Sequence, residues 1–389
     1  MIEYKLKDGR NVYFSPSINR FWIDEVSGDI SGEYYETELS EIRLEITYLC
    51  NGNCNYCIVF GNKIENKKRM QISELWMWLQ KQNWFSKIKK IFIIGGEPLL
   101  FFNDIEFLLE RFEGEVRIST NATLVTREIA KRLKEYNVLL YVSLDGALFE
   151  DNLSRVYKNG SYMYYDVVNC LRILREEGVR YGIFMVATKE NVYRATETIK
   201  QIDKIFRPER IGYSMPHWTD NGFNEVTAEE YRDALLNLYI HRKEIHADIM
   251  QLVWRTKPLW QGRIKKYSCS LNTTQITILP DHSVVRCSKI DNDLICKNIS
   301  DEKMMRACPL ERAHIETEPC YTCIALASCG GGCPFDGIKR FGQIIDKREC
   351  VVTPPILQAA VKEVLSGIEK RTDLSKGIVC LDVIKEILK

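Results

Sequence analysis

The sequence lacks the features that would place this protein in a membrane, in a secretory pathway or on nucleic acid. No apolar run reaches the ~18 residues of a membrane-spanning helix. The polar start, MIEYKLKDGR, contains no apolar signal-peptide core. The 54 basic and 53 acidic residues leave a net charge of +1, which offers no basic surface to nucleic acid or an anionic membrane. We therefore expect a cytoplasmic protein with no nucleic-acid and no membrane partner.

Internal repeats, low-complexity tracts and linkers rich in proline or serine are absent as well. A chain of 389 residues with 45% hydrophobic content can form a large catalytic domain and a smaller one, and its cores need no disulfides. The 14 cysteines are therefore unexpected. Because the chain is large and has no export signal, clustered cysteines are more typical of metal ligands than of disulfides.

Residues 41–226 predict an α/β fold built as an open barrel. Short apolar runs typical of strands alternate there with amphipathic stretches typical of helices. Six such units imply a parallel sheet in a partial (β/α)6 TIM-like barrel, with functional residues at the carboxyl ends of the strands. The predicted strands are 42–48, 91–94, 116–119, 139–144, 181–187 and 211–215. The predicted helices are 73–82, 105–112, 127–136, 167–177 and 193–205.

The segments on either side of the predicted barrel, 1–40 and 227–267, have patterns typical of strands and of helices, respectively. Residues 1–40 predict a β-rich lead-in with a hairpin turn at Asp8-Gly9. This hairpin either offers an edge strand to a leader peptide or caps the barrel floor. Residues 227–267 predict a helical connector.

The C-terminal part predicts two further segments. Residues 268–353 are loop-rich and cysteine-dense, so that metal would supply the cross-links of this domain. The Pro354-Pro355 pair is expected to break the chain before the C-terminal helices of 354–389. Cys170 and Cys380 lie in helical apolar patterns and are expected in the core.

Three cysteines follow the first predicted barrel strand directly, in the stretch TYLCNGNCNYC. Cys50, Cys54 and Cys57 can converge from one short loop, and Gly52 would let the backbone turn sharply between them. Three thiolates on a four-iron cluster leave one iron without a protein ligand. A zinc knuckle or three unrelated thiols would give the same spacing, but the position after the first strand argues against both.

With this motif the chain resembles the radical S-adenosylmethionine (SAM) superfamily, over about residues 41–350. In that family the open iron chelates SAM, and reductive cleavage gives a 5′-deoxyadenosyl radical. The resemblance implies that the aromatic Tyr56 contacts the adenine. Ser143 and Arg155 would bind the ribose or the carboxylate, for which a planar guanidinium fits well. A solvent-exposed charge is the alternative for Arg155.

A second family motif ends the apolar strand IFII. The resemblance assigns it to the methionine amino group of SAM. Its residues are Gly95, Gly96, Glu97 and Pro98. Alone, this tetrapeptide would be an ordinary turn.

The later cysteines resemble the SPASM extension of radical SAM enzymes that modify peptides and proteins. The resemblance implies two auxiliary clusters, hence three [4Fe-4S] clusters in all. Cluster one would be held by Cys269, Cys287 and Cys333. Cluster two would be held by Cys320, Cys323, Cys329 and Cys350. The fourth ligand of cluster one stays open between Cys296, Cys308 and a free iron. A zinc ribbon is the alternative, and His282 stands where the family has glycine.

The resemblance implies an enzyme that oxidatively cross-links a ribosomally synthesised precursor peptide, through a thioether or a C–C bond. Its electron donor would be ferredoxin or flavodoxin. The alternatives are anaerobic sulfatase maturation to formylglycine and small-molecule dehydrogenation. Formylglycine-forming members carry Asp, Gln and Tyr where this chain has Ser288, Ile94 and Val59, which favours cross-linking. Residues 217–223 either line the substrate groove or form a surface loop.

Overall fold

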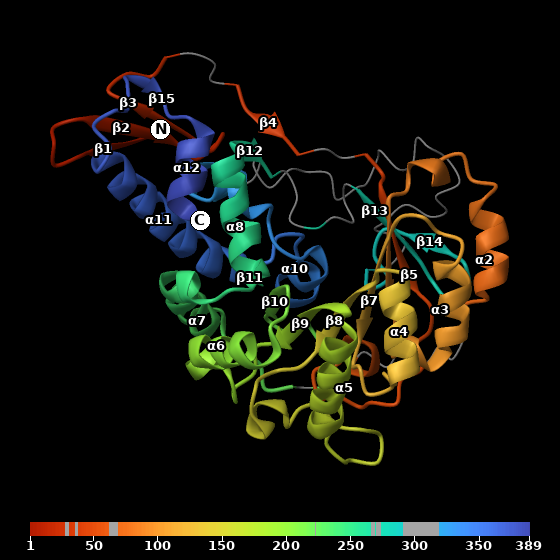
Figure 1. The fold of residues 1–389 in the computed structure, drawn as a ribbon. Coiled ribbons are helices and arrows are strands. Elements are labelled where there is room, and N and C mark those ends of the chain that lie inside the picture. Colours follow the sequence, from red (N-terminus) through yellow and green to blue (C-terminus); the bar gives the residue numbers. More distant parts are fainter. Residues whose placement is uncertain are drawn as a thin grey trace.

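The computed structural model describes residues 1–27, 31–35, 38–61, 69–221, 223–265, 269, 274–290 and 319–389. Its largest sheet has nine strands in the order β11-β10-β9-β8-β7-β6-β5-β13-β14. The six central strands pair in parallel, and the helices between them cover one side (Figure 1). The sheet does not close, so the predicted partial barrel is confirmed.

The six predicted strands and five predicted helices are all present. The central strands are β5 (Glu41–Glu45), β6 (Lys90–Ile94), β7 (Glu115–Thr120), β8 (Leu139–Ser143), β9 (Arg180–Val186) and β10 (Arg210–Ser214). The helices between them are α2 (Ile72–Leu79), α3 (Phe102–Leu109), α4 (Arg127–Glu135), α5 (Tyr164–Glu177) and α6 (Ala195–Phe206).

Three strands at the ends of the sheet were not predicted. β11 (Asp248–Ile249) pairs with β10, and β13 (Gln275–Ile278) pairs in parallel with β5. β14 (Val284–Val285) then returns antiparallel to β13. β13 alternates Gln275 and Thr277 with two isoleucines, but the strand is only four residues long, too short for its alternation to predict it. The segment predicted to be loop-rich thus begins by extending the barrel sheet.

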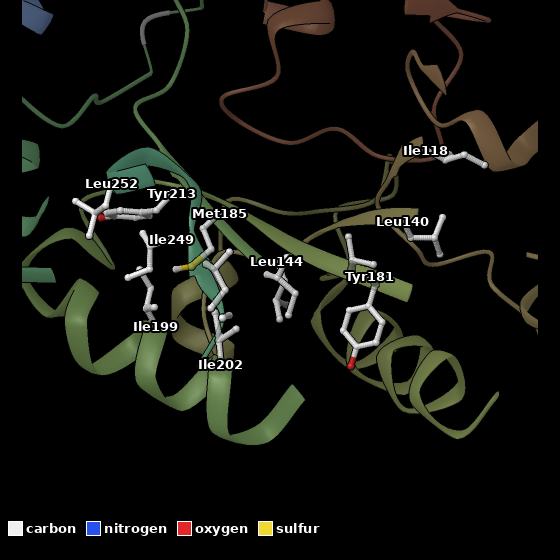
Figure 2. Packing of buried hydrophobic residues seen from close by; sticks show 14 of the residues in the cluster. Ile118, Leu140, Leu144, Tyr181, Met185, Ile199, Ile202, Tyr213, Ile249 and Leu252 are labelled. Carbon is white, nitrogen blue, oxygen red and sulfur yellow. The ribbon is translucent and has the colours of Figure 1, made fainter. Parts of the chain in front are cut away.

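The barrel core forms where apolar strand residues meet the covering helices. Figure 2 shows Ile199 and Ile202 of α6 directed toward the strands, where Met185 and Ile249 belong to the same buried cluster. Each of the four is at most 4% exposed. Burying one such side chain contributes about 1.5–3 kcal/mol, so this interface holds the strand ends in place.

The two ends of the chain share a second sheet. β1 (Ile2–Lys5) and β2 (Asn11–Ser15) form the predicted hairpin, with Gly9 at its turn in a left-handed conformation (φ +91°). β3 (Arg20–Ile23) continues the sheet, and β15 (Gly377–Ile378) pairs antiparallel with it. This sheet lies beside α11 and α12 (Figure 1).

The prediction that two prolines break the chain is wrong. Helix α11 runs from Arg348 to Glu369 with Pro354 and Pro355 inside it. A proline removes one backbone donor from a helix. Here the buried face of α11, which contacts α7 and α8, stabilises the helix despite the missing donors.

The remaining elements complete the C-terminal half. Cys380 caps α12 and is exposed, so its predicted core position is wrong, whereas Cys170 is buried as predicted. In the described parts of the chain, no helix is both long and apolar enough to cross a bilayer. The remaining helices are α1 (Ile58–Gly61), α7 (Ala228–His241), α8 (Met250–Gln261), α9 (Leu326–Cys329), α10 (Pro334–Phe341) and α12 (Leu381–Leu388). The remaining strands are β4 (Glu33–Tyr34) and β12 (Arg263–Ile264).

Candidate active site

The loop after β5 carries Cys50, Cys54 and Cys57. The backbone N–H of Gly52 lies 3.2 Å from Cys50 Sγ, and Cys57 N donates to Cys54 O (3.1 Å). Gly52 is not in a left-handed conformation. A Cβ at this position would instead lie 2.5 Å from Met163 Cε. The predicted sharp turn is therefore not the reason for glycine here, and a Cβ would meet only the flexible end of the Met163 side chain.

The segment after β6 runs tightly against the start of this loop. Gly96 N donates to Thr47 O (2.7 Å), and Glu97 N donates to Leu49 O (2.8 Å). A Cβ on Gly95 would lie 2.3 Å from Thr47 O, and one on Gly96 would lie 2.2 Å from Leu49 O. The two glycines are thus required for the approach of two backbones.

Glu97 is fully buried and is a centre of hydrogen bonding. Its carboxylate accepts from Leu99 N (3.0 Å), Thr120 Oγ1 (2.7 Å) and Asn121 N (2.7 Å). Burial raises the pKa of the Glu97 carboxyl, and these donors offset part of the rise. Asn121 in turn donates to Asn51 Oδ1 (2.8 Å), next to Cys50. Glu97 therefore positions the cysteine loop, a role that its motif did not predict.

Two other predicted SAM residues, Tyr56 and the buried Arg155, form a hydrogen-bonded trio with the buried Asp145. Tyr56 Oη donates to Asp145 Oδ2, and Arg155 Nη1 donates to Tyr56 Oη (2.6 Å). Arg155 also lies 3.8 Å from Asp145. Burial raises the pKa of Asp145, partly offset by the Arg155 charge. Asp145 follows the predicted Ser143, which ends β8, and sequence patterns gave it no role.

One donor in this trio has no partner. Arg155 Nε is buried and makes no hydrogen bond to any described residue. An unsatisfied buried donor costs about 1–3 kcal/mol. A bound anionic or hydroxyl-rich group would supply the missing acceptor. The residues present therefore fit the carboxylate or ribose of SAM.

The C-terminal cysteines gather in two groups. Burial raises the pKa of the Cys287 and Cys333 thiols, and the nearby thiol of Cys269 adds to both. Burial likewise raises the pKa of Cys350, with Cys320 and Cys323 beside it. The structure thus brings together the three cysteines assigned to cluster one and three of the four assigned to cluster two.

Cys329, the fourth cysteine assigned to cluster two, lies among charged side chains. Burial raises its pKa to about 12, with the Glu349 carboxylate adding and the charges of Lys265 and Arg255 opposing. It ends α9, and the three glycines that follow, 330–332, all have left-handed backbones. Cys296 and Cys308 lie outside the described residues.

A small apolar cluster connects the two halves of the site. Ile290 and Phe335 are buried at its centre. Around them pack Ile58, Trp218, Cys287, Cys333, Ile338 and Ile344. Ile58 directly follows the third cysteine of the SAM motif, so this cluster lies between that motif and the proposed auxiliary cluster one.

The 217–223 segment also reaches the SAM cysteine loop. Asn221 Nδ2 donates to Asn55 O (2.6 Å), and the ring of Phe223 meets Tyr56 edge-on at 5.7 Å. Together with Trp218 in the apolar cluster, these contacts place the segment at the carboxyl ends of the strands.

Glu45 is a candidate functional residue that sequence analysis missed. It ends β5 and is 2% exposed. Ser288 Oγ donates to Glu45 Oε1 (2.5 Å), and Lys289 Nζ lies 3.4 Å from Oε2. A carboxylate is thus present beside Ser288, although the chain has no Asp there. The available signal was an acidic residue between Leu44 and Ile46, inside the predicted strand 42–48.

Comparison with known proteins agrees with this geometry. Residues 44–202 match the Radical SAM superfamily. These residues form a radical SAM domain. A chain from Methanocaldococcus jannaschii, MJ0907, is 32% identical over 171 residues, which are 42% of this chain and 58% of that protein. The radical SAM cyclopropyl synthase TigE of Paramaledivibacter caminithermalis is 24% identical over 351 residues, 80% of this chain and 72% of that one.

Solved structures share the fold of this chain over most of its length. Native anSMEcpe with bound AdoMet and the Kp18Cys peptide has a TM-score of 0.67 at 21% identity, covering 85% of this chain and 99% of that one. SuiB from Streptococcus suis, bound to the precursor peptide SuiA, has a TM-score of 0.58 at 18% identity, covering 80% and 76%.

Proposed function

We propose that this radical SAM enzyme matures a precursor peptide by forming an oxidative cross-link, either a thioether or a C–C bond. The observation that carries the proposal is the position of Cys269, Cys287 and Cys333. Cys287 and Cys333 pack in the small apolar cluster that also contains Ile58, the residue after the third SAM-motif cysteine, and the Cys269 thiol is near both. A substrate bound beside this cluster would have a radical source on one side and an electron acceptor on the other.

The chain would hold its cofactors with residues from the strand ends. Cys50, Cys54 and Cys57 would bind the first [4Fe-4S] cluster, which together with bound SAM supplies the 5′-deoxyadenosyl radical. SAM itself would be bound by Tyr56, Gly95, Gly96, Glu97, Pro98, Ser143 and Arg155. Cluster one would be bound by Cys269, Cys287 and Cys333. Cluster two would be bound by Cys320, Cys323, Cys329 and Cys350.

Cross-linking removes two hydrogens from the peptide. One leaves as a hydrogen atom, which the deoxyadenosyl radical takes to become 5′-deoxyadenosine. The other leaves as a proton and an electron when the new bond forms. An auxiliary cluster would accept the electron, and Glu45 would accept the proton, since it is the buried carboxylate next to Cys287-Ser288. Ferredoxin or flavodoxin would supply the electron for SAM cleavage.

The position of Glu45 also supports a second candidate function, sulfatase maturation. Sulfatase maturation needs a carboxylate near the second SPASM cysteine, and the structure provides one through the Ser288–Glu45 hydrogen bond. Formylglycine formation on a Cys or Ser peptide is therefore the alternative to cross-linking.

A peptide assay distinguishes these functions. Reconstituted enzyme with SAM and dithionite should convert its precursor peptide to a product lighter by two hydrogens, with any participating Cys no longer alkylatable. Cys287→Ala should stop this product and leave uncoupled SAM cleavage. Cys170→Ala removes a buried thiol outside the site and should leave the product unchanged. Formylglycine on a sulfatase-derived peptide would contradict cross-linking and support the alternative.

A further inference from the structure

A histidine lies beside the cysteines of the proposed auxiliary cluster one. Among the described residues, one ring nitrogen of His217, Cys333 Sγ and a carboxylate oxygen of Asp336 lie within 4.8 Å of one another. His217 follows β10 of the barrel, whereas Cys333 caps α10 and Asp336 lies in the first turn of that helix. Barrel and cysteine-rich region therefore contribute to one group of metal-binding side chains.

Asp336 has no free oxygen with which to bind a metal. Its Oδ2 accepts from His217 Nδ1 (2.6 Å) and pairs with Arg348 Nη2 at 3.0 Å. Its Oδ1 accepts from Trp218 N (2.7 Å) and from Arg340 Nε (3.4 Å). The carboxylate is 1% exposed and is surrounded by donors. Its role is to orient its neighbours.

The hydrogen bond from His217 to Asp336 determines which ring nitrogen of His217 is available to a metal. When Nδ1 donates its proton to the carboxylate, Nε2 carries the lone pair that binds metals. In many metal sites the histidine ring is oriented by a carboxylate that accepts a hydrogen bond from the nitrogen that does not bind the metal. The His217 side chain is 52% exposed, and within the described chain Nε2 has no hydrogen-bond partner.

We propose that His217 is the fourth ligand of auxiliary cluster one, through Nε2. The three cysteines of that cluster leave one iron unassigned, and His217 lies beside Cys333. This inference rests on the proposed auxiliary cluster but not on the identity of the peptide. A cluster with four protein ligands has no open iron for a substrate thiolate, so it serves the reaction as an electron acceptor only.

The test reads the nitrogen ligand directly by pulsed EPR of the reduced, reconstituted full-length protein. Protein grown with ¹⁵N-histidine should show a histidine nitrogen coupled to an auxiliary cluster. His217→Cys should lose that coupling and keep about twelve irons, because a thiolate replaces the imidazole. His282→Gly, a histidine near Cys287, is the matched control and should keep the coupling. So should Cys296→Ala and Cys308→Ala.

Absence of a histidine coupling in the wild-type protein would overturn the proposal, and this result does not depend on any variant folding. Persistence of the coupling in His217→Cys, or loss of cluster iron in Cys296→Ala or Cys308→Ala, would do the same. None of these spectra requires a peptide substrate. Failure here is thus distinguishable from failure of the peptide assay.

Discussion

Glu97 illustrates what a residue motif conveys and what it omits. The motif identified Glu97 and the two glycines before it, because their spacing and their place after a strand are visible in the sequence. It did not identify Asn121, Asp145 or Glu45. Their partners lie on neighbouring strands or in the cysteine-rich region, and chain spacing does not record which segments become neighbours in space. Local motifs were thus predictable, and the contacts between them were not.

Replacing Glu97 tests its role in positioning the loop. Glu97→Ala should lower the free energy of unfolding by roughly 2–4 kcal/mol, because three buried donors lose their acceptor. Glu97→Gln keeps one acceptor oxygen and should lose less. Urea unfolding of the apoprotein gives both values. Equal stability of the Ala variant and the wild type would show that the hydrogen bonds around Glu97 do not hold the loop.

Arg155 tests the cofactor pocket. Arg155→Ala should weaken SAM binding by roughly 1–3 kcal/mol, since a charge-assisted contact is lost. Iron content should not change, because Arg155 is not a ligand. Equilibrium dialysis of labelled SAM measures the affinity. Arg180→Ala, which removes a surface ion pair with Glu209, is the control and should bind SAM normally. Unchanged affinity in Arg155→Ala would place the cofactor elsewhere.

At the scale of elements, strands with one apolar run were predictable, whereas short buried strands were not. β13 contains Gln275 and Thr277 among isoleucines, and its pairing with β5 depends on residues more than 200 positions apart. For helix α11 the local signal was clear but misleading. Pro354-Pro355 predicted a break, whereas packing against the distant helices α7 and α8 keeps the helix continuous.

The turn between β13 and β14 offers an element-scale prediction. His282 sits there with a left-handed backbone (φ +67°), which disfavours a residue with a Cβ. His282→Gly should therefore stabilise the protein by roughly 0.5–1 kcal/mol. Thermal unfolding measures the difference. His246→Gly, at an exposed position without a left-handed backbone, should destabilise it instead. A lower melting temperature for His282→Gly would refute this explanation of the turn.

At the scale of the whole molecule, the barrel, the cysteine groups and the apolar cluster between them predict the metal content. Anaerobically reconstituted protein should bind about twelve irons, as three four-iron clusters. Replacing Cys50, Cys54 and Cys57 together by Ala should remove about four irons and abolish 5′-deoxyadenosine formation. Iron and zinc analysis measures this. Zinc in the cysteine-rich region, with about four irons in the intact protein, would contradict the two auxiliary clusters.

The sheet shared by the two chain ends affects how the protein is made. β3 finds its partner β15 only after about 350 further residues have left the ribosome. At roughly 5–20 residues per second, the interval is roughly 20–70 s. Throughout this time β3 has an unpaired edge beside the buried Trp22, open to pairing with another nascent chain. A chain whose synthesis stops before β15 would therefore have a complete barrel but an unpaired β3 edge, which can pair with other chains.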